Sequence, residues 1–464
     1  MQLAAALAAG LALRLYFIHF YGETAGDTLL YGDIAKNLLQ HGIFGLTHDA
    51  GPTPTIIRLP GYPLFLAACF RLFGTEHYNA VMYVQCVADL LACAVAGATA
   101  ARLWGRKAGL STLWIAALCP FTANYVATPL TEALTIFCTV AALYALVRWR
   151  TAAMDKPLEM DLWFWMMAVA LACSLLLRPD NGLLMAALIP AAVWIAWTHH
   201  DPTNNRPAVR AHAVEMAVVL CIAVLLPLVP WTCRNWRTFH EIQPLAPRYA
   251  TDPGELVGYG FNRWYRTWAM EYKSTEDIYW NLNDETMDIN TIPTRAFDSD
   301  AQYEATRQLL DEYNDTTTET PEMDARFDAI AQQRIAANPL RYYVELPTAR
   351  VIDMWLRPRT ERLPLDTEWW NYGEHPLESI LIAGYALLNL AYLLAAGIGA
   401  WKAWRWLSSE QRPILWAMLG FVALRTALLF TLDNAEQRYT LECFPMIFLL
   451  GGYALSCDWR RQSN

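Results

Sequence analysis

The stretch LWFWMMAVALACSLLLRPDNGLLMAALIPAAVWIAW, residues 162–197, decides the fold class of this chain. Two apolar runs, residues 162–177 and 182–197, meet at the polar turn Arg178-Pro179-Asp180-Asn181. An apolar run of this kind crosses a bilayer as a helix, because a helix satisfies its own backbone hydrogen bonds where no water can reach. The stretch therefore predicts a pair of transmembrane helices that turn at one face of a membrane.

Similar apolar windows recur along the whole chain of 464 residues. The ten windows are residues 3–20, 78–104, 108–125, 130–149, 162–177, 182–197, 213–231, 380–401, 414–432 and 439–457. The first window has no Lys or Arg before Arg14 and no clear small-residue cleavage site, so we expect it to be retained as a span. We predict an all-α polytopic membrane protein with about ten transmembrane helices.

The composition agrees with this fold class and excludes others. Only 17% of the residues are charged, where soluble domains average about 25%. The net charge of −9 argues against nucleic-acid binding, which needs clustered positive charge. The ten cysteines show no C-x-x-C spacing, so we predict neither a metal site nor a disulfide framework, and no cofactor.

The charge distribution predicts how the chain is organised. Basic residues collect on the cytoplasmic side of membrane proteins, and Arg102, Lys107 and Lys402 share that side if the N-terminus is cytoplasmic. Residues 234–374 hold 15 basic against 25 acidic residues, which indicates an outward soluble region. We expect an N-terminal transmembrane module (1–233) with a first outer loop (21–77), a mostly helical extracytoplasmic region (234–376), and C-terminal transmembrane helices (377–464).

The first outer loop contains two further helical patterns. Residues 27–40 repeat apolar positions on one face, Asp27 is placed to cap the start of this helix, and Gly42 is placed to stop it. Asp33 is expected to form a salt bridge with Lys36. Residues 62–73 are too short to span comfortably and predict a helix that lies in or dips into the interface.

Charged residues gather at the outer ends of the predicted spans, where charge is costly unless it is paired or functional. These residues are Asp27, Glu132, Arg178, Arg234, Glu436 and Arg438, and Arg425 lies inside the ninth window. All would project to one face of the membrane, so we expect a single outward-facing site.

Several of these residues belong to strings that carry a family resemblance. The strings are Gly26-Asp27-x-x-x-Tyr31-x-x-Ile34-Ala35-x-Asn37-Leu38-Leu39-x-x-Gly42, Arg58-x-Pro60-Gly61-Tyr62-Pro63, Arg178-Pro179-Asp180, Pro230-Trp231-x-x-Arg234-Asn235 and Glu436-x-Arg438-Tyr439. In this order they resemble the GT-C glycosyltransferases. The closer likeness is to the family 39-like branch, which includes protein O-mannosyltransferases and the aminoarabinose and Rgt-type bacterial transferases.

The resemblance implies transfer of a sugar from a polyprenyl-phosphate-linked donor to a glycan, lipid or protein acceptor on the extracytoplasmic side, with inversion. It implies Asp27 as the catalytic base and Glu132 as the second acidic position. The chemistry fits, because a carboxylate can accept the proton of an attacking hydroxyl. The chain departs from the mannosyltransferase pattern at Thr28, where those enzymes carry a second acid.

The departing lipid phosphate needs cationic stabilisation, which guanidinium groups supply. The predicted substrate-binding residues are Arg58, Tyr62, Arg178, Arg234, Arg425, Glu436, Arg438 and Tyr439. We expect a multi-pass protein of the inner or plasma membrane. Two alternatives stay open: a transporter or flippase of lipid-linked solutes, which would place ionisable residues deep in several spans, and a polymerase or ligase of diphosphate-linked glycans.

Overall fold

The computed structural model describes the chain except for residues 25, 152–160, 199–205, 366–369, 371 and 457–464. The fold is mostly helical, which confirms the predicted class. The described residues form two compact units, each treated by itself below. The large unit comprises residues 1–253, 391–424 and the chain from 441 onward, and the small unit comprises residues 254–390 and 425–440. The predicted three-part division by domain stays a prediction.

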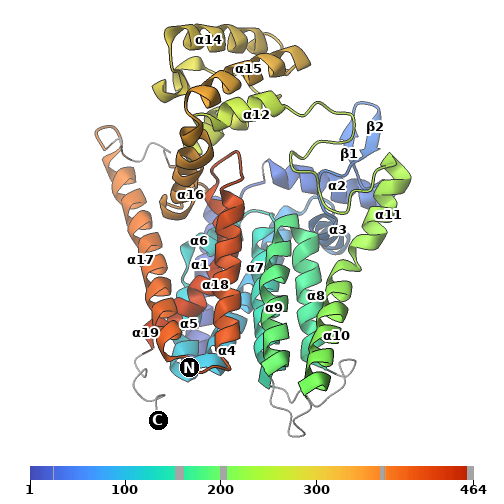
Figure 1. Ribbon diagram of the computed structural model, residues 1–464, viewed down its shortest axis with the longest axis vertical. Helices are drawn as coiled ribbons and strands as arrows, with labels where there is room; N and C mark the ends of the chain where they lie inside the picture. Colours follow the sequence, from blue (N-terminus) through green and yellow to red (C-terminus); the bar gives the residue numbers. More distant parts are fainter. Residues whose placement is uncertain (25, 152–160, 199–205, 366–369, 371, 457–464) are drawn as a thin grey trace. The chain divides into compact units, whose positions relative to one another are not determined.

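The large unit is built on mostly apolar helices, the longer of which run alongside one another (Figure 1). They are α1 (Gln2–Tyr21), α4 (Tyr78–Trp104), α5 (Arg106–Ala117), α6 (Pro120–Tyr125), α7 (Glu132–Thr151), α8 (Leu162–Leu177), α9 (Gly182–Thr198), α10 (Arg206–Leu225), α11 (Leu228–Phe239) and α19 (Phe444–Leu455). Helix α17 (Pro376–Trp406) begins in the small unit and ends in the large one. Helix α18 (Arg412–Leu429) begins in the large unit and ends in the small one.

Six of the helices among the described residues are long and apolar enough to cross a membrane, or seven if the bent pair α10–α11 forms one span. The windows at 108–125, 162–177 and 439–457 correspond to shorter helices: α5 and α6 are separate, α8 has 16 residues and α19 has 12. About 20 residues are needed to span a bilayer. The count of ten is therefore not confirmed, and residue 457 lies outside the described part.

The first loop packs on this helical framework. It contains α2 (Asp27–His41), a hairpin of β1 (Gly45–His48) and β2 (Gly51–Pro54), and α3 (Gly61–Phe73). The sequence analysis did not predict the hairpin. A side chain at Gly61 would run into the carbonyl of Leu176, so glycine is what lets α3 start directly against the end of α8.

The predicted ends of α2 are half right. Gly42 ends the helix in a left-handed conformation, with its N–H directed to the carbonyls of Asn37 and Leu38, as predicted. Asp27 is not the cap: it is the first helical residue, Gly26 occupies the cap position, and no side chain caps this end. The Asp27 carboxylate instead accepts a hydrogen bond from Arg58.

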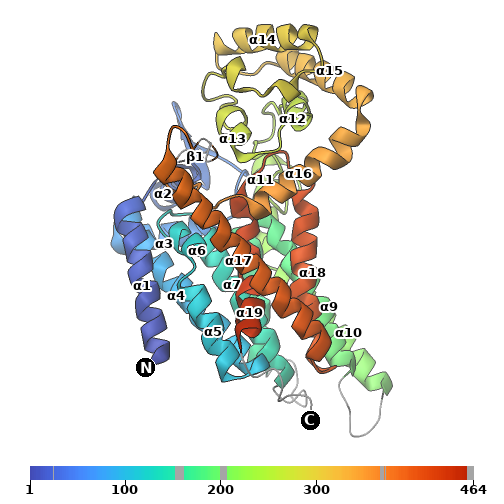
Figure 2. The same ribbon diagram turned by 90° about the vertical axis from the view of Figure 1, so that its left-hand side faces the viewer.

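The small unit has its own aromatic core. Its helices are α12 (Tyr259–Arg266), α13 (Tyr272–Ser274), α14 (Asp300–Asn314), α15 (Pro321–Ala337) and α16 (Leu346–Leu356), with π-helical turns at Thr275–Tyr279 and Arg341–Glu345. Short 3₁₀ turns of this unit lie at Ile289–Thr291 and Thr294–Ala296, and a third, Gln437–Cys443, begins in it. The large unit has a 3₁₀ turn of its own after α8, at Pro179–Asn181. Phe261, Trp264 and Phe327 bring α12 against α15, and α14 packs on α15 (Figure 2).

Candidate active site

Asp27 stands at the start of α2 in an ion pair with Arg58. The Arg58 Nη2 donates to Asp27 Oδ1 at 2.7 Å, and both side chains keep some contact with solvent. Thr28, the next residue, donates its hydroxyl to the carbonyl of Pro129 and so ties this end of α2 to the segment before α7. The structure thus presents the Asp27 carboxylate at an accessible position on a fixed helix end.

The rings of Tyr31 and Tyr62 pack next to the ion pair of Asp27 and Arg58. The Arg58 guanidinium lies 5.6 Å above the Tyr31 ring, which contacts the Tyr62 ring edge-on at 5.0 Å between centroids. Burial raises the pKa of Tyr31, and the charge of Arg58 opposes that rise. The Tyr62 hydroxyl is buried and donates to Gln85 at 2.6 Å. Tyr62 therefore anchors α3 of the first loop to α4.

The hairpin is held to α2 by polar contacts. Asp33 accepts hydrogen bonds from the backbone N–H and the hydroxyl of Thr47 and pairs with Lys36, as predicted. Burial disfavours the Asp33 carboxylate, but the Thr47 hydrogen bonds and Lys36 outweigh burial and lower its pKa. The buried Asn37 side chain donates to the carbonyl of Gly45. These contacts give Asp33 a structural role in the loop.

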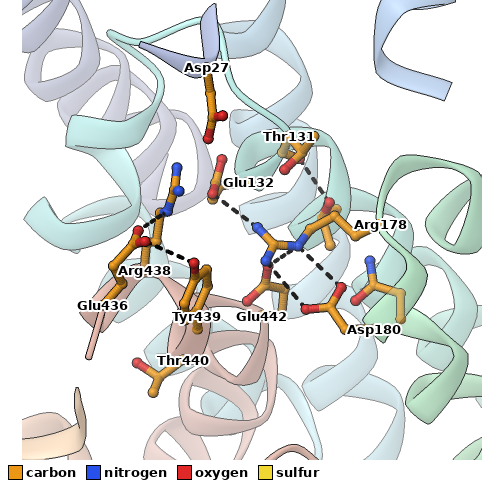
Figure 3. A network of polar contacts seen from close by, with 12 residues as sticks. Asp27, Thr131, Glu132, Arg178, Asp180, Glu436, Arg438, Tyr439, Thr440 and Glu442 are labelled. Atoms are coloured by element: carbon orange, nitrogen blue, oxygen red, sulfur yellow. Dashed lines mark hydrogen bonds and ion pairs between the residues drawn. The ribbon is translucent and has the colours of Figure 1, made fainter. Parts of the chain in front are cut away.

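Arg178 collects three carboxylates in the large unit. Its guanidinium contacts Glu132 at 3.2 Å, Asp180 through two nitrogens at 3.2 and 3.3 Å, and Glu442 at 3.3 Å (Figure 3). Glu132 and Glu442 are almost fully buried. In Figure 3 the Asp27 and Glu132 carboxylates point toward one another. The large unit thus brings Asp27, Glu132 and Arg178 to one region.

Arg234 is occupied by backbone contacts. It donates to the carbonyls of Thr55 at 2.8 Å and Phe44 at 2.6 Å, and its guanidinium lies over the rings of Phe44 and Trp231. Arg234 therefore ties α11 to the hairpin in this structure, and its role in donor binding stays a prediction.

The segment Glu436–Tyr439 of the small unit forms a second polar group. Glu436 accepts hydrogen bonds from Asn434 and from the Tyr439 hydroxyl, each at 2.8 Å, and its carboxylate pairs with Arg438 (Figure 3). Arg425 is fully buried in α18 and donates to the Tyr439 carbonyl at 2.8 Å. These four predicted residues are therefore held together within one unit.

Two residues at these sites were missed by the sequence analysis. Glu442 is a charge inside the last apolar window, and that position was a readable signal. Arg359 is buried and donates to Asn389, to the carbonyl of Gln437 and to the Thr440 hydroxyl, so it fixes the segment after Glu436. Nothing in the pattern around Arg359 connects it with a segment so distant in sequence.

The large unit also contains a buried ion pair between two of its apolar helices. Arg14 of α1 donates to Asp89 of α4 at 2.6 Å, and both side chains are buried. The other Arg14 nitrogens donate to the carbonyls of Gly10 and Ala117 and to the Cys93 sulfur. This pair is closed by protein contacts and links α1, α4 and the end of α5.

No group of three or more His, Cys, Asp or Glu side chains in the described part of the chain is arranged to hold a metal ion. Glu132, Asp180 and Glu442 surround Arg178 instead.

Comparison with known proteins gives a partial sequence match. Residues 54–231 match the family model of dolichyl-phosphate-mannose-protein mannosyltransferases. No curated protein sequence matches the chain. The family match includes α3 to α10 and the first part of α11, and so contains Arg58, Glu132 and Arg178.

Solved structures give a match over nearly the whole chain. The oligosaccharyltransferase AglB of Archaeoglobus fulgidus, in complex with an inhibitory peptide and a dolichol-phosphate, is 11% identical with a TM-score of 0.52, over 98% of this chain and 50% of AglB. Its apo form gives 12% identity, a TM-score of 0.53 and the same coverage. The likeness shows the fold, and this chain spans about half the length of AglB.

A second protein has a weaker likeness. ArnT of Cupriavidus metallidurans, bound to undecaprenyl phosphate, is 12% identical with a TM-score of 0.40, and the match covers 98% of this chain and 77% of ArnT.

Proposed function

We propose that this chain is a membrane glycosyltransferase of the GT-C superfamily, which its partial match to the dolichyl-phosphate-mannose-protein mannosyltransferase family supports, and that it transfers a sugar from a polyprenyl-phosphate-linked donor to an extracytoplasmic acceptor. The acceptor is a hydroxyl of a cell-envelope glycan, lipid or protein. Asp27 acts as the general base, and the reaction inverts the anomeric centre. The enzyme works in the inner or plasma membrane with its site facing outward.

The observation that carries the proposal is the ion pair between Asp27 and Arg58. A guanidinium 2.7 Å from the carboxylate favours its ionised form, which is the form that accepts a proton. The carboxylate is partly exposed, so an incoming hydroxyl has access to it. A base needs both properties.

The proposed step is a direct displacement. The acceptor oxygen forms a bond to the anomeric carbon while the bond from that carbon to the phosphate oxygen breaks. The electron pair leaves with the polyprenyl phosphate, and the acceptor proton passes to Asp27. A single base on the face opposite the leaving group accounts for inversion.

The leaving phosphate needs positive charge, and we assign that task to Arg178, because Arg58 is paired with the base on the opposite face of the sugar. Arg178 is held by Glu132 and belongs to the same unit as the base. Tyr62 supports the loop, and Glu132 orients Arg178. Arg234, Arg425, Glu436, Arg438 and Tyr439 remain candidates for contacts with the donor.

The test is release of polyprenyl phosphate from a panel of polyprenyl-phosphate sugars by the purified protein, with membrane extract as the acceptor source. We expect Asp27→Asn to lower the transfer rate about 10²- to 10⁴-fold while the protein stays folded. The matched control is Asp33→Asn, which removes a carboxylate from the same helix. Because Asp33 contacts Thr47 and Lys36, its variant should retain transfer.

Three results would overturn the proposal. Full transfer by folded Asp27→Asn would show that Asp27 is not the base. No release from any donor by a folded wild-type protein that moves such lipids across vesicles would favour the transporter alternative. Release only from diphosphate-linked glycans would favour the polymerase or ligase.

A further inference from the structure

The chain between α6 and α7 leaves helical geometry inside the large unit. Residues 126–131 form turns and bends between Tyr125, the last residue of α6, and Glu132, the first residue of α7. All residues of this segment are buried. A break in a helix frees backbone carbonyls, and a buried carbonyl needs a hydrogen-bond partner. The partners that the segment takes therefore show what is fixed against it.

Two carbonyls of this segment hold the start of the first loop. The carbonyl of Ala127 accepts a hydrogen bond from the backbone N–H of Glu23 at 3.1 Å. The carbonyl of Pro129 accepts one from the Thr28 hydroxyl at 3.2 Å. Glu23 precedes Asp27 in the sequence and Thr28 follows it. The segment therefore fixes the chain on both sides of Asp27, and it leads directly into α7.

Gln85 of α4 holds the segment from the other side. Its side chain is fully buried, and its amide nitrogen donates to the carbonyls of Thr128 at 2.9 Å and Val126 at 3.4 Å. These two residues flank Ala127, whose carbonyl holds the first loop. The amide oxygen of Gln85 accepts from the Tyr62 hydroxyl at 2.6 Å. One buried amide thus connects α4, α3 and the segment, with both of its polar atoms in use.

We propose that Gln85 is a positioning residue for the transfer reaction, because it sets the place of residues 126–131 and, through them, of the Asp27 base relative to α7. The inference rests on the proposed function, since it concerns the geometry of that site. The carboxylates of Asp27 and Glu132 point toward one another (Figure 3), and each is attached to this segment. Gln85 contacts neither carboxylate, so it acts through the backbone that carries them.

A purely structural role of Gln85 predicts a different result. In that case its loss would lower the melting temperature and leave the kcat of the folded molecules unchanged. Under the proposal the kcat of the folded protein falls, because a misplacement of about 1 Å at a reacting group can cost about 10²-fold in rate. Donor binding should be retained, because Gln85 shifts the base and leaves Arg178 with its own carboxylate partners.

The first test is steady-state transfer by purified Gln85→Leu, which keeps a similar volume and can neither donate nor accept. We expect kcat to fall about 10- to 100-fold, with the donor KM within about twofold of the wild-type value. The matched control is Gln411→Leu, because Gln411 also donates to a backbone carbonyl, that of Leu103 near the last residue of α4, at 2.8 Å. This control should keep the wild-type kcat. A wild-type kcat in folded Gln85→Leu would overturn the proposal.

A double-mutant cycle tests whether Gln85 acts through the segment. Thr28→Val removes the hydroxyl that contacts Pro129 and keeps the shape of the side chain, and we expect kcat to fall about tenfold. If both contacts position the base through the same segment, the double variant Gln85→Leu with Thr28→Val loses less than the product of the two single effects. Effects that simply multiply would contradict the shared route. If Gln85→Leu does not fold, a wild-type kcat in Thr28→Val overturns the proposal instead.

Hydrogen exchange separates this inference from the proposed function. The Glu23 N–H is held by the segment, so Gln85→Leu should speed exchange about tenfold in the peptide that contains Glu23, and Gln411→Leu should not. Faster exchange there in a chain that transfers nothing would support the positioning role and refute the reaction. Normal transfer by the wild type, with kcat and exchange unchanged in Gln85→Leu, would refute the role of Gln85 and leave the reaction standing.

Discussion

Two arginines in the large unit contact carboxylates in different numbers. Arg14 faces one carboxylate, Asp89, and its remaining nitrogens donate to backbone carbonyls and a sulfur. Arg178 faces three carboxylates, those of Glu132, Asp180 and Glu442. The first arrangement balances its charge and is closed. The second gathers three carboxylates around one guanidinium.

The difference separates a structural ion pair from a site. A balanced pair inside a membrane protein is costly to break, because the remaining charge is stranded away from water. Several carboxylates held around one cation are an arrangement that concentrates at functional sites. We therefore expect Arg14 to serve stability and Arg178 to belong to the proposed site.

Asp89→Asn should give the largest effect. It leaves the Arg14 guanidinium buried without a counter-charge, and we expect a loss of about 3–5 kcal/mol in the free energy of unfolding. The measurement is denaturant unfolding in detergent micelles. The control is the double variant Arg14→Met with Asp89→Leu, which removes both charges and should recover most of the stability. A single-variant loss below about 1 kcal/mol would mean that the pair is not structural.

Glu319 in the small unit extends the comparison to a buried carboxylate whose neighbour is a second carboxylate, that of Asp324. It is buried beside Asp324, and burial first, then that carboxylate, raises its pKa to about 8. The folded chain therefore keeps a proton that the unfolded chain releases above about pH 4.5. Stability should fall as the pH rises from about 5 to 8, by on the order of 3 kcal/mol.

The check is the unfolding free energy of the purified chain across this pH range. Glu319→Gln should remove most of the slope, because the variant has no proton to lose. Glu322→Gln, an exposed neighbour on α15, should leave the slope unchanged. An identical slope in wild type and Glu319→Gln would contradict the assignment.

Glu442→Gln should have the smallest effect on stability and a moderate one on activity. It removes one surplus charge near Arg178, so the melting temperature should stay level or rise. Transfer should drop about tenfold, because Arg178 loses one of the groups that orient it. A fall in melting temperature as large as that of Asp89→Asn would show that both clusters are structural.

Much of the fold was predictable because it depends on local pattern. Hydropathy located the apolar helices, and Gly42 marked the end of α2. Asp33 pairs with Lys36, which is only three residues further along the same helix. The error at Asp27 shows the limit of local rules. Its sequence position suits a cap, but Arg58, 31 residues on, takes the carboxylate.

The sequence named residues of the candidate site but not the pairs that they form. Asp27, Glu132 and Arg178 were named from their positions and family strings, but pairing among Glu132, Arg178 and Glu442 depends on three helices meeting in space. The hairpin was missed because its two strands have four residues each, with proline and glycine in the second. Short strands of that composition carry little signal.

The Arg234 contacts have a mechanical consequence. Arg234 joins α11 to both arms of the hairpin through Phe44 and Thr55, and Asp33 and Asn37 join the hairpin to α2. The bend of 44° between α10 and α11 lies at the other end of this linkage. A series of hydrogen bonds therefore connects α11, next to this bend, with α2, a helix some 200 residues away in sequence.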